Sequence, residues 1–370
     1  MGGSRMGSAP GAAMLQGRLL LVAAIALCMP GAEAFGEAPK FLIISAPSTG
    51  KISYLKLPTS GAPAVAADQT ATTNATSLLD KGQTAVSVKR TLRAEENTVT
   101  DLISEGLTFP QGIAVDQYRK NLYVADPNLG KLVSYPLKSS RRQPLYVGSQ
   151  QLVADNVEVR AVAVDGLGNV FFTEEPTGRI MRVTAKMIAD GVTTAETVYD
   201  SASSKGVSSP GGIALDNYFV YWLNKVGGVG HGTLLRARQN PHPEALLNVT
   251  KQQVNGSGAA MIALASNAVK CYGVCIALGN LYYSDESTNL YGIHRASTAQ
   301  HDPVTVSSSL QQPRGCAFDG DSTVYVADKV GNAVYQFPSN TQDLTDVPPL
   351  TKAADLQGAF GVAVYTQIET

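Results

Sequence analysis

The amino-acid sequence predicts an all-β fold, a six-bladed β-propeller with four antiparallel strands in each blade. The first observation behind this prediction is a five-residue phrase with a small first residue, alternating apolar positions and usually a closing aspartate. Its six copies begin 42 to 61 residues apart, a spacing typical of one propeller blade or one solenoid turn. The copies are Gly112–Asp116, Ala161–Asp165, Gly212–Asp216, Gly273–Ala277, Gly315–Asp319 and Gly361–Tyr365.

The second observation is a strand that follows the phrase after a short turn. Five copies of the phrase lead into a run of aromatic and β-branched residues, which favour strands and so predict a repeated hairpin. These second strands are Leu122–Asp126, Val170–Glu174, Val220–Asn224, Leu281–Asp285 and Val324–Asp328.

Two further strands complete each unit. A Gly or Asn, which tolerates a left-handed backbone, precedes the third strand. A more variable fourth strand follows, as in Glu196–Asp200 or Pro303–Ser307. Four antiparallel strands per repeat form a propeller blade, and a small residue is expected where the inner strands converge on a narrow axis. The predicted third strands are Lys131–Tyr135, Arg179–Val183, Leu290–His294 and Ala333–Phe337.

The third observation is that the two ends of the repeat region complete each other. Phe41–Leu55 aligns without a gap with Asn121–Tyr135, which places Gly50 on Gly130. The aligned segment therefore supplies a second and a third strand with no first strand before them. Conversely, Gly361–Tyr365 is a first strand with no second strand after it. Joined in one blade, these strands close the ring and leave no unpaired sheet edge.

Residues 1–34 are predicted to be a cleaved signal peptide. Arg18 precedes the apolar run Leu19–Leu27, and small residues occupy the two positions that signal peptidase recognises. The run is about half the roughly 20 residues that a membrane-spanning helix needs, which favours a signal peptide over an anchor. Initiation at Met14 is left open. We expect no transmembrane segment after cleavage, and a protein that is secreted or lies in the lumen of the secretory pathway.

The propeller is expected to occupy residues 35–370, with two loop insertions. Residues 58–97 are rich in Ala, Thr, Ser and Gln and predict a low-complexity loop. Residues 248–270 are predicted to be the second insertion. Its apolar run Ala259–Leu264 suits either a helical turn packed on the ring or a contact patch.

The composition limits the classes of partner that are expected. The chain has 29 Lys and Arg against 30 Asp and Glu, a net charge of −1. Nucleic-acid-binding proteins show a basic excess or a basic run, so no nucleic-acid partner is expected, and a protein or a small molecule remains. Three predicted N-glycosylation sites agree with export, at Asn74, Asn248 and Asn255.

The cysteines leave the disulfide pattern open. Cys271, Cys275 and Cys316 remain after signal cleavage, so at most one intramolecular bridge forms. Cys275 and Cys316 lie in first strands of neighbouring repeats, where small core residues are equally expected. A turn could bring Cys271 to Cys275 or to Cys316, whereas two cysteines four apart in an extended strand are too distant to bridge.

The repeated motifs resemble those of known propellers. Tyr221–Asn224 and Tyr282–Asp285 are similar to the YWTD blades of the low-density lipoprotein receptor family. Such propellers include ligand-binding ectodomains, scaffolds, lactonases and lyases, so the resemblance implies the fold more than the function. The segments that resemble NHL repeats are Phe109–Asp116 with Asn121–Asp126, and Pro313–Asp319 with Tyr325–Asp328.

Polar residues that end the second strands form one candidate site. Around one face they could meet a basic partner or hold a calcium ion as a cofactor, because hard cations prefer several carboxylate and amide oxygens. In propellers of this type the equivalent acid commonly binds backbone amides of the next turn, and this structural role is favoured. The aspartates that close the first strands are expected to form Asx turns. The second-strand residues are Asp126, Glu174, Asn224, Asp285 and Asp328, and the first-strand aspartates are Asp116, Asp165, Asp216 and Asp319.

Residues just before each inner strand form the other candidate site, at the mouth of the central channel. Arg160 and Arg314 could both face an anionic ligand, or each could pair with a neighbouring acid. A pocket mouth is the default site on a propeller. The ring consists of Gln111, Arg160, Gly211, Tyr272, Arg314 and Phe360.

A binding module is favoured over the alternative, a metal-dependent hydrolase, lactonase or lyase with its site in the channel. The resemblance to gluconolactonase-like enzymes implies a metal-binding Glu-Gly-Pro phrase near the N-terminus, but Ile44–Pro47 stands there without an acid. Related lyases use a histidine-bound zinc. The four histidines of this chain are all expected on the surface or in loops, at His231, His242, His294 and His301. Strictosidine-synthase-like relatives use a single Glu and are not excluded.

Overall fold

The computed structural model describes the propeller region. The predicted signal peptide, residues 59–97 and the sequons at Asn74, Asn248 and Asn255 lie outside the described residues. The described residues are 38–58, 98–204, 206–225, 232–241, 261–267, 269–297, 302–339, 344 and 349–368.

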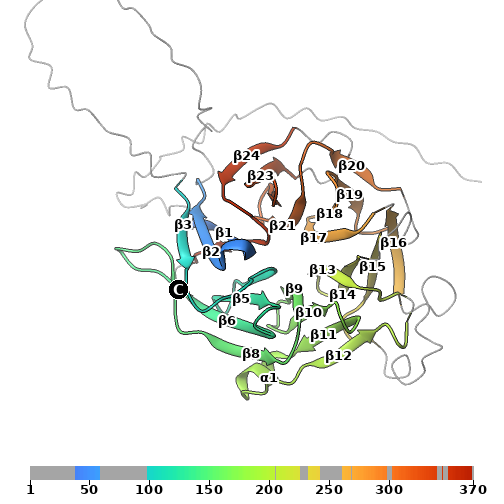
Figure 1. The fold of residues 1–370 in the computed structure, drawn as a ribbon, viewed down its shortest axis with the longest axis horizontal. Coiled ribbons are helices and arrows are strands. Elements are labelled where there is room, and N and C mark those ends of the chain that lie inside the picture. The colour runs from blue at the N-terminus through green and yellow to red at the C-terminus, as the bar shows by residue number, and fades with distance from the viewer. Residues whose placement is uncertain are drawn as a thin grey trace, which may run out of the picture. The chain divides into compact units, whose positions relative to one another are not determined.

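Six small antiparallel sheets stand in a ring, which confirms the six-bladed propeller (Figure 1). We number the blades 1 to 6 from the N-terminal blade onward. The innermost strands, in that order, are β25 (Val362–Thr366), β4 (Ile113–Asp116), β9 (Val159–Val164), β13 (Pro210–Leu215), β17 (Cys271–Ala277) and β21 (Pro313–Phe318). The second strands are β1 (Lys40–Ala46), β5 (Asn121–Asp126), β10 (Val170–Glu174), β14 (Phe219–Asn224), β18 (Asn280–Asp285) and β22 (Thr323–Asp328).

The outer strands complete the blades, and short helical segments connect some of them. The third strands are β2 (Lys51–Lys56), β6 (Lys131–Lys138), β11 (Arg179–Val183), β15 (Gly232–Arg238), β19 (Leu290–His294) and β23 (Ala333–Pro338). The fourth strands are β3 (Thr100–Ile103), β8 (Gln151–Asp155), β12 (Glu196–Asp200), β16 (Met261–Asn267), β20 (Val304–Ser307) and β24 (Thr351–Asp355). In blade 2 the short strand β7 (Tyr146–Val147) also pairs with β6. The connecting helices are η1 (Pro47–Thr49) and α1 (Ala185–Ala189).

The ring closes in blade 1, as the sequence predicts. Strand β25 pairs with β1 in antiparallel register, with Phe41 opposite Tyr365. The gapless alignment of the N-terminal segment is also confirmed at its turn. Gly50 and Gly130 have φ values of 67° and 65°, and each donates its N–H over 3.2 Å to the carbonyl of the proline three residues earlier. The predicted strand exchange therefore holds the two ends of the described chain in one sheet.

One predicted segment is corrected. Residues 248–270 were expected to form a loop insertion, but Met261–Asn267 forms β16, the outermost strand of blade 4. The apolar run Ala259–Leu264 is thus partly strand rather than a helical turn. Its packing on the ring is confirmed for Met261 and Leu264, which are fully buried. An apolar run this short does not distinguish a helix from a strand by its periodicity, and pairing with β15 decides the outcome.

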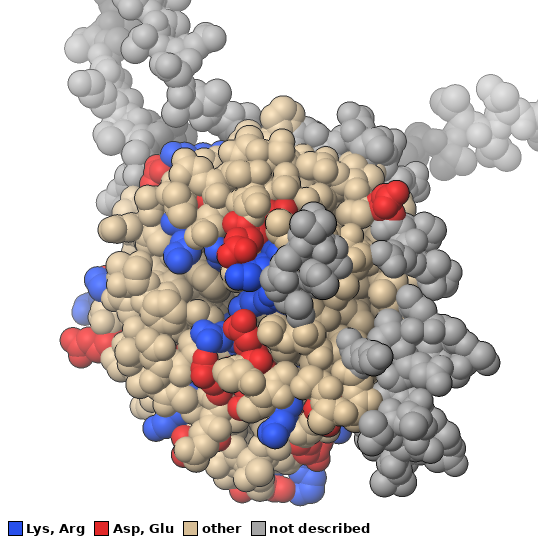
Figure 2. Space-filling model, turned by 45° about the vertical axis from the view of Figure 1, so that its right-hand side comes forward, with Lys and Arg blue, Asp and Glu red and all other residues tan. Residues whose placement is uncertain are grey.

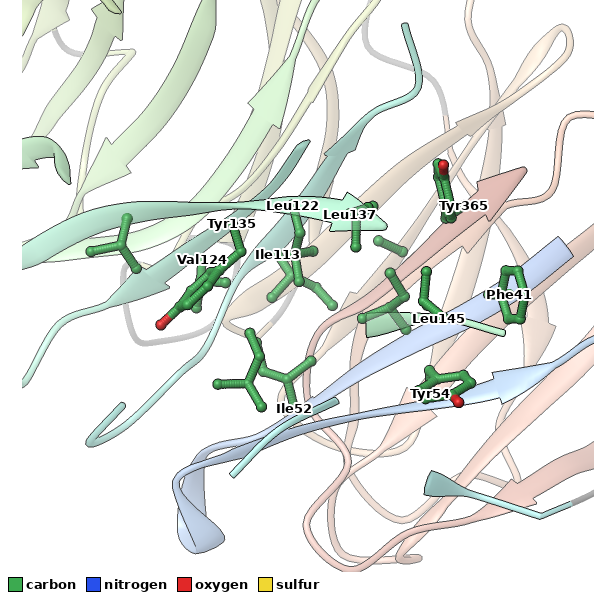
Figure 3. Close-up of a cluster of buried hydrophobic side chains, with 14 residues drawn as sticks. Phe41, Ile52, Tyr54, Ile113, Leu122, Val124, Tyr135, Leu137, Leu145 and Tyr365 are labelled. Atoms are coloured by element: carbon green, nitrogen blue, oxygen red, sulfur yellow. The ribbon is translucent and has the colours of Figure 1, made fainter. Parts of the chain in front are cut away.

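Successive residues of a second strand enter two different cores because their side chains point to opposite faces of the sheet. In β10, Phe172 packs in the core between blades 2 and 3, whereas Phe171 packs in the core between blades 3 and 4. Figure 3 shows the corresponding core between blades 1 and 2, to which blade 1 contributes Phe41 and Tyr54 and blade 2 contributes Leu122 and Tyr135. Each blade is therefore buried on both faces, which explains the nearly continuous apolar runs in the second strands.

Small residues let the inner strands meet around the axis, and each inner strand contacts the next. A side chain on Gly273 would place its Cβ 2.0 Å from the carbonyl oxygen of Arg314, and one on Gly361 would lie 2.4 Å from that of Gln111. These distances are far below van der Waals contact, so a side chain at Gly273 or Gly361 would displace the backbone of the next blade. The predicted close approach of the inner strands is present.

The disulfide pattern that the sequence left open is resolved. Cys275 of β17 and Cys316 of β21 are joined, which ties the inner strands of blades 5 and 6 together. Cys271 is buried and free. Within the described part of the chain, no helix is long and apolar enough to cross a membrane.

Candidate functional site: the mouth of the central channel

A cavity of about 110 Å³ lies at the centre of the ring. All six inner strands contribute to its wall, so it is the end of the central channel at which the inner strands begin. The structure brings together the whole ring predicted from the sequence, since the cavity is lined by Gln111, Arg160, Gly211, Tyr272, Arg314 and Phe360.

Backbone hydrogen bonds between blades fix these mouth residues. In blade 2 the N–H of Gly112 donates to Arg160 O of blade 3 over 3.2 Å. In blade 6 the N–H of Gly315 donates to Phe360 O of blade 1 over 2.8 Å. The mouth residues are thus anchored through their main chains, which leaves their side chains available to line the cavity.

At three other junctions between blades a hydroxyl of the second strand contacts the mouth backbone of the next blade. The N–H of Gly273 donates to Ser284 Oγ over 3.0 Å, and this hydroxyl donates to Arg314 O over 2.8 Å. The same bridge is made by Ser45 to Gln111 O over 2.6 Å and by Thr173 to Gly211 O over 2.7 Å. Blades 1, 3 and 5 carry the hydroxyl, so this hydroxyl bridge occurs in every second blade of the ring.

Two cations flank one aromatic ring at the mouth. Arg314 is 4% exposed, and its Cζ lies 3.9 Å from the ring centre of Tyr272. Lys225 Nζ lies 5.0 Å from the same ring centre, so both cations interact with the π system. Burial raises the pKa of Tyr272, which keeps its phenol neutral beside them.

Arg160 and Arg314 differ in their partners. Glu175 Oε2 lies 3.0 Å from both Arg160 Nε and Lys225 Nζ, and Arg160 also pairs with Glu158. Arg314 donates Nη1 to Pro313 O over 2.9 Å, but it takes part in none of the ion pairs among the described residues. The expected alternative of pairing with acids therefore applies to Arg160 and not to Arg314.

The charge of the cavity wall is one-sided. Its described lining residues include the three cations Arg160, Lys225 and Arg314 but no carboxylate and no imidazole. The acids Glu158, Glu175 and Glu286 lie around the cations rather than in the wall. In Figure 2, Lys and Arg side chains lie next to Asp and Glu side chains near the middle of the face in view. The described wall therefore has a net positive charge.

The second-strand ring that could hold calcium does not gather into a metal site. Asp126 accepts the N–H groups of Thr108 and Phe109 at 2.7 and 3.0 Å, and Asp328 accepts those of Gln311 and Gln312 at 2.8 and 2.7 Å. Asn224 and Asp285 likewise accept backbone N–H groups, and Glu174 accepts the hydroxyl of Thr177. Among the described residues, no three His, Cys, Asp or Glu side chains lie close enough to share a metal. Asp126, Asn224 and Asp328 thus hold the segments that lead into the inner strands of their blades. Glu174 and Asp285 hold the turns that follow their own strands.

The aspartates that close the first strands form the predicted Asx turns. Asp319, for example, accepts three backbone N–H groups of its own turn, from Asp321, Ser322 and Thr323. Asp116, Asp165 and Asp216 accept N–H groups in the same way. His294 is exposed and its Nδ1 lies 2.8 Å from Asn280 Oδ1, away from the cavity wall. His231, His242 and His301 lie outside the described residues.

Lys225, Glu175 and Glu286 were missed by the sequence reasoning. Each directly follows the polar residue that ends a second strand, and this recurring position was the signal that could have found them. Lys225 also fills the space left by Gly211, where a Cβ would lie 2.7 Å from Lys225 Cε. Glu286 accepts a hydrogen bond from the phenol of Tyr272 over 3.4 Å.

Comparison with known proteins supports the fold. The sequence matches no family model and no curated protein. A chain in the crystal structure of a nidogen–laminin complex superimposes with a TM-score of 0.57 at 15% sequence identity, and the match covers 88% of this chain and 98% of that one. This neighbour is a YWTD-type six-bladed propeller, so the resemblance inferred from the motifs is confirmed. The chain has the fold of these propellers.

Two enzymes of the same fold are more distant. XC5397, a gluconolactonase from Xanthomonas campestris, has a TM-score of 0.49 at 15% identity, and the match covers 68% of this chain and 78% of that one. A streptogramin B lyase has a TM-score of 0.41 at 12% identity, with 67% and 68% of the two chains covered. Both are six-bladed propellers.

Proposed function

We propose that the protein is a binding module of the secretory pathway whose channel mouth binds an anionic group of a protein or small molecule. The observation that carries this proposal is Arg314, a buried guanidinium that lines the cavity without an ion-pair partner among the described residues. A buried charge is costly unless it is paired, and a ligand anion would supply the missing partner. The nidogen propeller, found in a complex with laminin, gives a precedent for a protein partner on this fold.

The proposed location rests on the predicted signal peptide and on the Cys275–Cys316 disulfide. Disulfides persist in oxidising compartments and are rare in the cytosol. The enzymatic alternative needs metal ligands or a catalytic acid in the channel. Among the described lining residues only Gln111 offers a side-chain carbonyl oxygen, so the wall chemistry supports binding rather than metal-assisted hydrolysis.

Replacement of Arg314 tests the proposal. We expect Arg314→Met to weaken the binding of acetate, sulfate and inorganic phosphate by at least about tenfold, since a hydrogen bond to a charged group contributes about 1.5–3 kcal/mol. The measurement is the rise in melting temperature with anion concentration. Lys186→Met is the matched control, because the Lys186 side chain is 82% exposed on α1. An unchanged response of Arg314→Met, or no response of the unmodified protein, would contradict the proposal.

Anion affinity should also fall at alkaline pH. Burial lowers the pKa of Lys225 below its usual 10.5, while the Glu175 carboxylate opposes this shift and Arg160 and Arg314 reinforce it. A lysine with a lowered pKa is charged well below that pKa and neutral above it, so one cation of the mouth is lost before pH 10.5. We expect acetate affinity to decrease over this range in the unmodified protein. In Lys225→Arg the decrease should be absent, because the guanidinium stays charged; identical pH profiles would contradict the assignment.

A further inference from the structure

The channel wall directly below the mouth is apolar. The residue after each small opening residue lines the cavity, and these six side chains retain only 5 to 9% exposure. They occupy the same position in all six inner strands, so they form a closed ring. Its members are Ile113, Val162, Ile213, Val274, Cys316 and Val362.

The mouth above this ring has one positive charge in excess. Its three cations are Arg160, Lys225 and Arg314, and the carboxylates that pair with them are Glu158 and Glu175. Arg314 takes part in none of the ion pairs among the described residues, and Glu286, whose charge also acts on Arg314, pairs with Lys270. A singly charged anion would neutralise the charge of Arg314, whereas a second negative charge on the ligand would be repelled by Glu158 and Glu175. A planar carboxylate also matches the two-pronged geometry of a guanidinium.

The volume limits the part of the ligand that the cavity can enclose. An apolar cavity of about 150 Å³ accommodates one benzene molecule, and the cavity at the channel mouth is about 110 Å³. Because polar groups line only its upper part, a fully polar ligand would leave hydrogen bonds unmade against the aliphatic ring. A short acid with an apolar body fits both parts.

We propose that the ligand of this cavity is a small amphiphilic monocarboxylic acid, an inference that rests on the proposed anion site. Its carboxylate pairs with Arg314 at the mouth, and its apolar body enters the channel between the aliphatic side chains of the inner strands. Specificity arises from two positions in each repeat, one on either side of the small residue that begins the phrase. The position before the small residue supplies the charge, and the position after it supplies the apolar wall.

A chain-length series on the full protein tests this inference. Acetate, propanoate, butanoate, pentanoate and hexanoate are titrated calorimetrically at neutral pH, with butanamide as the neutral match and succinate as the doubly charged match. We expect affinity to rise by about fourfold per methylene, the gain for burying one CH₂, until the channel is filled. Butanamide should bind at least about tenfold more weakly than butanoate because it lacks the charge, and succinate should also bind more weakly than butanoate.

A channel-filling variant locates the apolar body. Val274→Phe should lose the gain in affinity with chain length, while Val274→Ala should retain the gain and extend it to longer acids. The Ala variant keeps the test decisive if the Phe variant fails to fold. Wild-type binding of acetate, sulfate and phosphate with no gain along the series would overturn this inference and leave the anion site intact. If no anion binds, or if butanamide equals butanoate, both proposals fail; succinate binding as tightly as butanoate would overturn the monocarboxylate assignment alone.

Discussion

Reduction of the Cys275–Cys316 disulfide is expected to lower the free energy of unfolding by about 4 kcal/mol. The two cysteines are 41 residues apart, and in the chain-entropy account a bridge across a loop of this length removes about that much conformational freedom from the unfolded chain. The bond joins the inner strands of blades 5 and 6, so the loop that it closes contains β18, β19 and β20. The measurement is urea-induced unfolding with and without a reductant.

Two cysteine variants serve as controls for this prediction. The double variant Cys275→Ala with Cys316→Ala should be insensitive to the reductant, whereas Cys271→Ala should remain as sensitive as the unmodified protein, because Cys271 is free. If Cys271→Ala instead removed the effect of the reductant, the pairing between blades would be wrong. The alternative pairings with Cys271, which the sequence left open, would then apply.

Gly273→Ala is expected to destabilise the protein by about 3 kcal/mol, at the upper end of the usual cost of overpacking. The new Cβ would lie 2.0 Å from the carbonyl oxygen of Arg314 and 2.8 Å from Cα of Gly315. Both atoms belong to the backbone of the next blade, so no side-chain rotation can relieve the clash. Blades 5 and 6 would have to separate at the axis, where the N–H of Gly273 is also bonded through Ser284.

Gly166→Ala is the matched control for Gly273→Ala. Gly166 lies in the turn after β9, and a Cβ added there meets nothing within 4 Å. Its effect on the free energy of unfolding should stay within about 0.5 kcal/mol, as for other surface substitutions. Equal urea-denaturation midpoints for the two variants would mean that the inner strands are not packed as closely as the structure shows.

Much of the fold could be predicted from local patterns. The second strand Val170–Glu174 was predicted with the same bounds as β10, because a run of β-branched and aromatic residues favours a strand wherever it lies. The shared blade was also predictable, since counting strands at the two ends left one set incomplete at each. The segment around β16 was not, because its short apolar run has no distinctive period and only pairing with β15 makes it a strand.

The ring of residues at the channel mouth could be predicted from the sequence, but the contacts that their side chains make could not. Repetition alone placed Arg160 and Arg314 at equivalent positions of blades 3 and 6. It could not show that Arg160 pairs with Glu175 while Arg314 packs on Tyr272. It also missed Lys225, whose aliphatic chain occupies the space that Gly211 leaves open. Such contacts depend on which side chains of neighbouring blades point into the same volume.

The sequence by itself determined the repeat, the number of blades, the closure of the ring and the six positions that surround the channel. These properties follow from backbone propensity and side-chain alternation, which act over a few residues and are repeated at a regular spacing. Only the tertiary structure decided which cysteines join and which arginine has no ion-pair partner among the described residues. Both depend on contacts between blades, whose residues are distant in sequence and meet only when the inner strands converge on the axis.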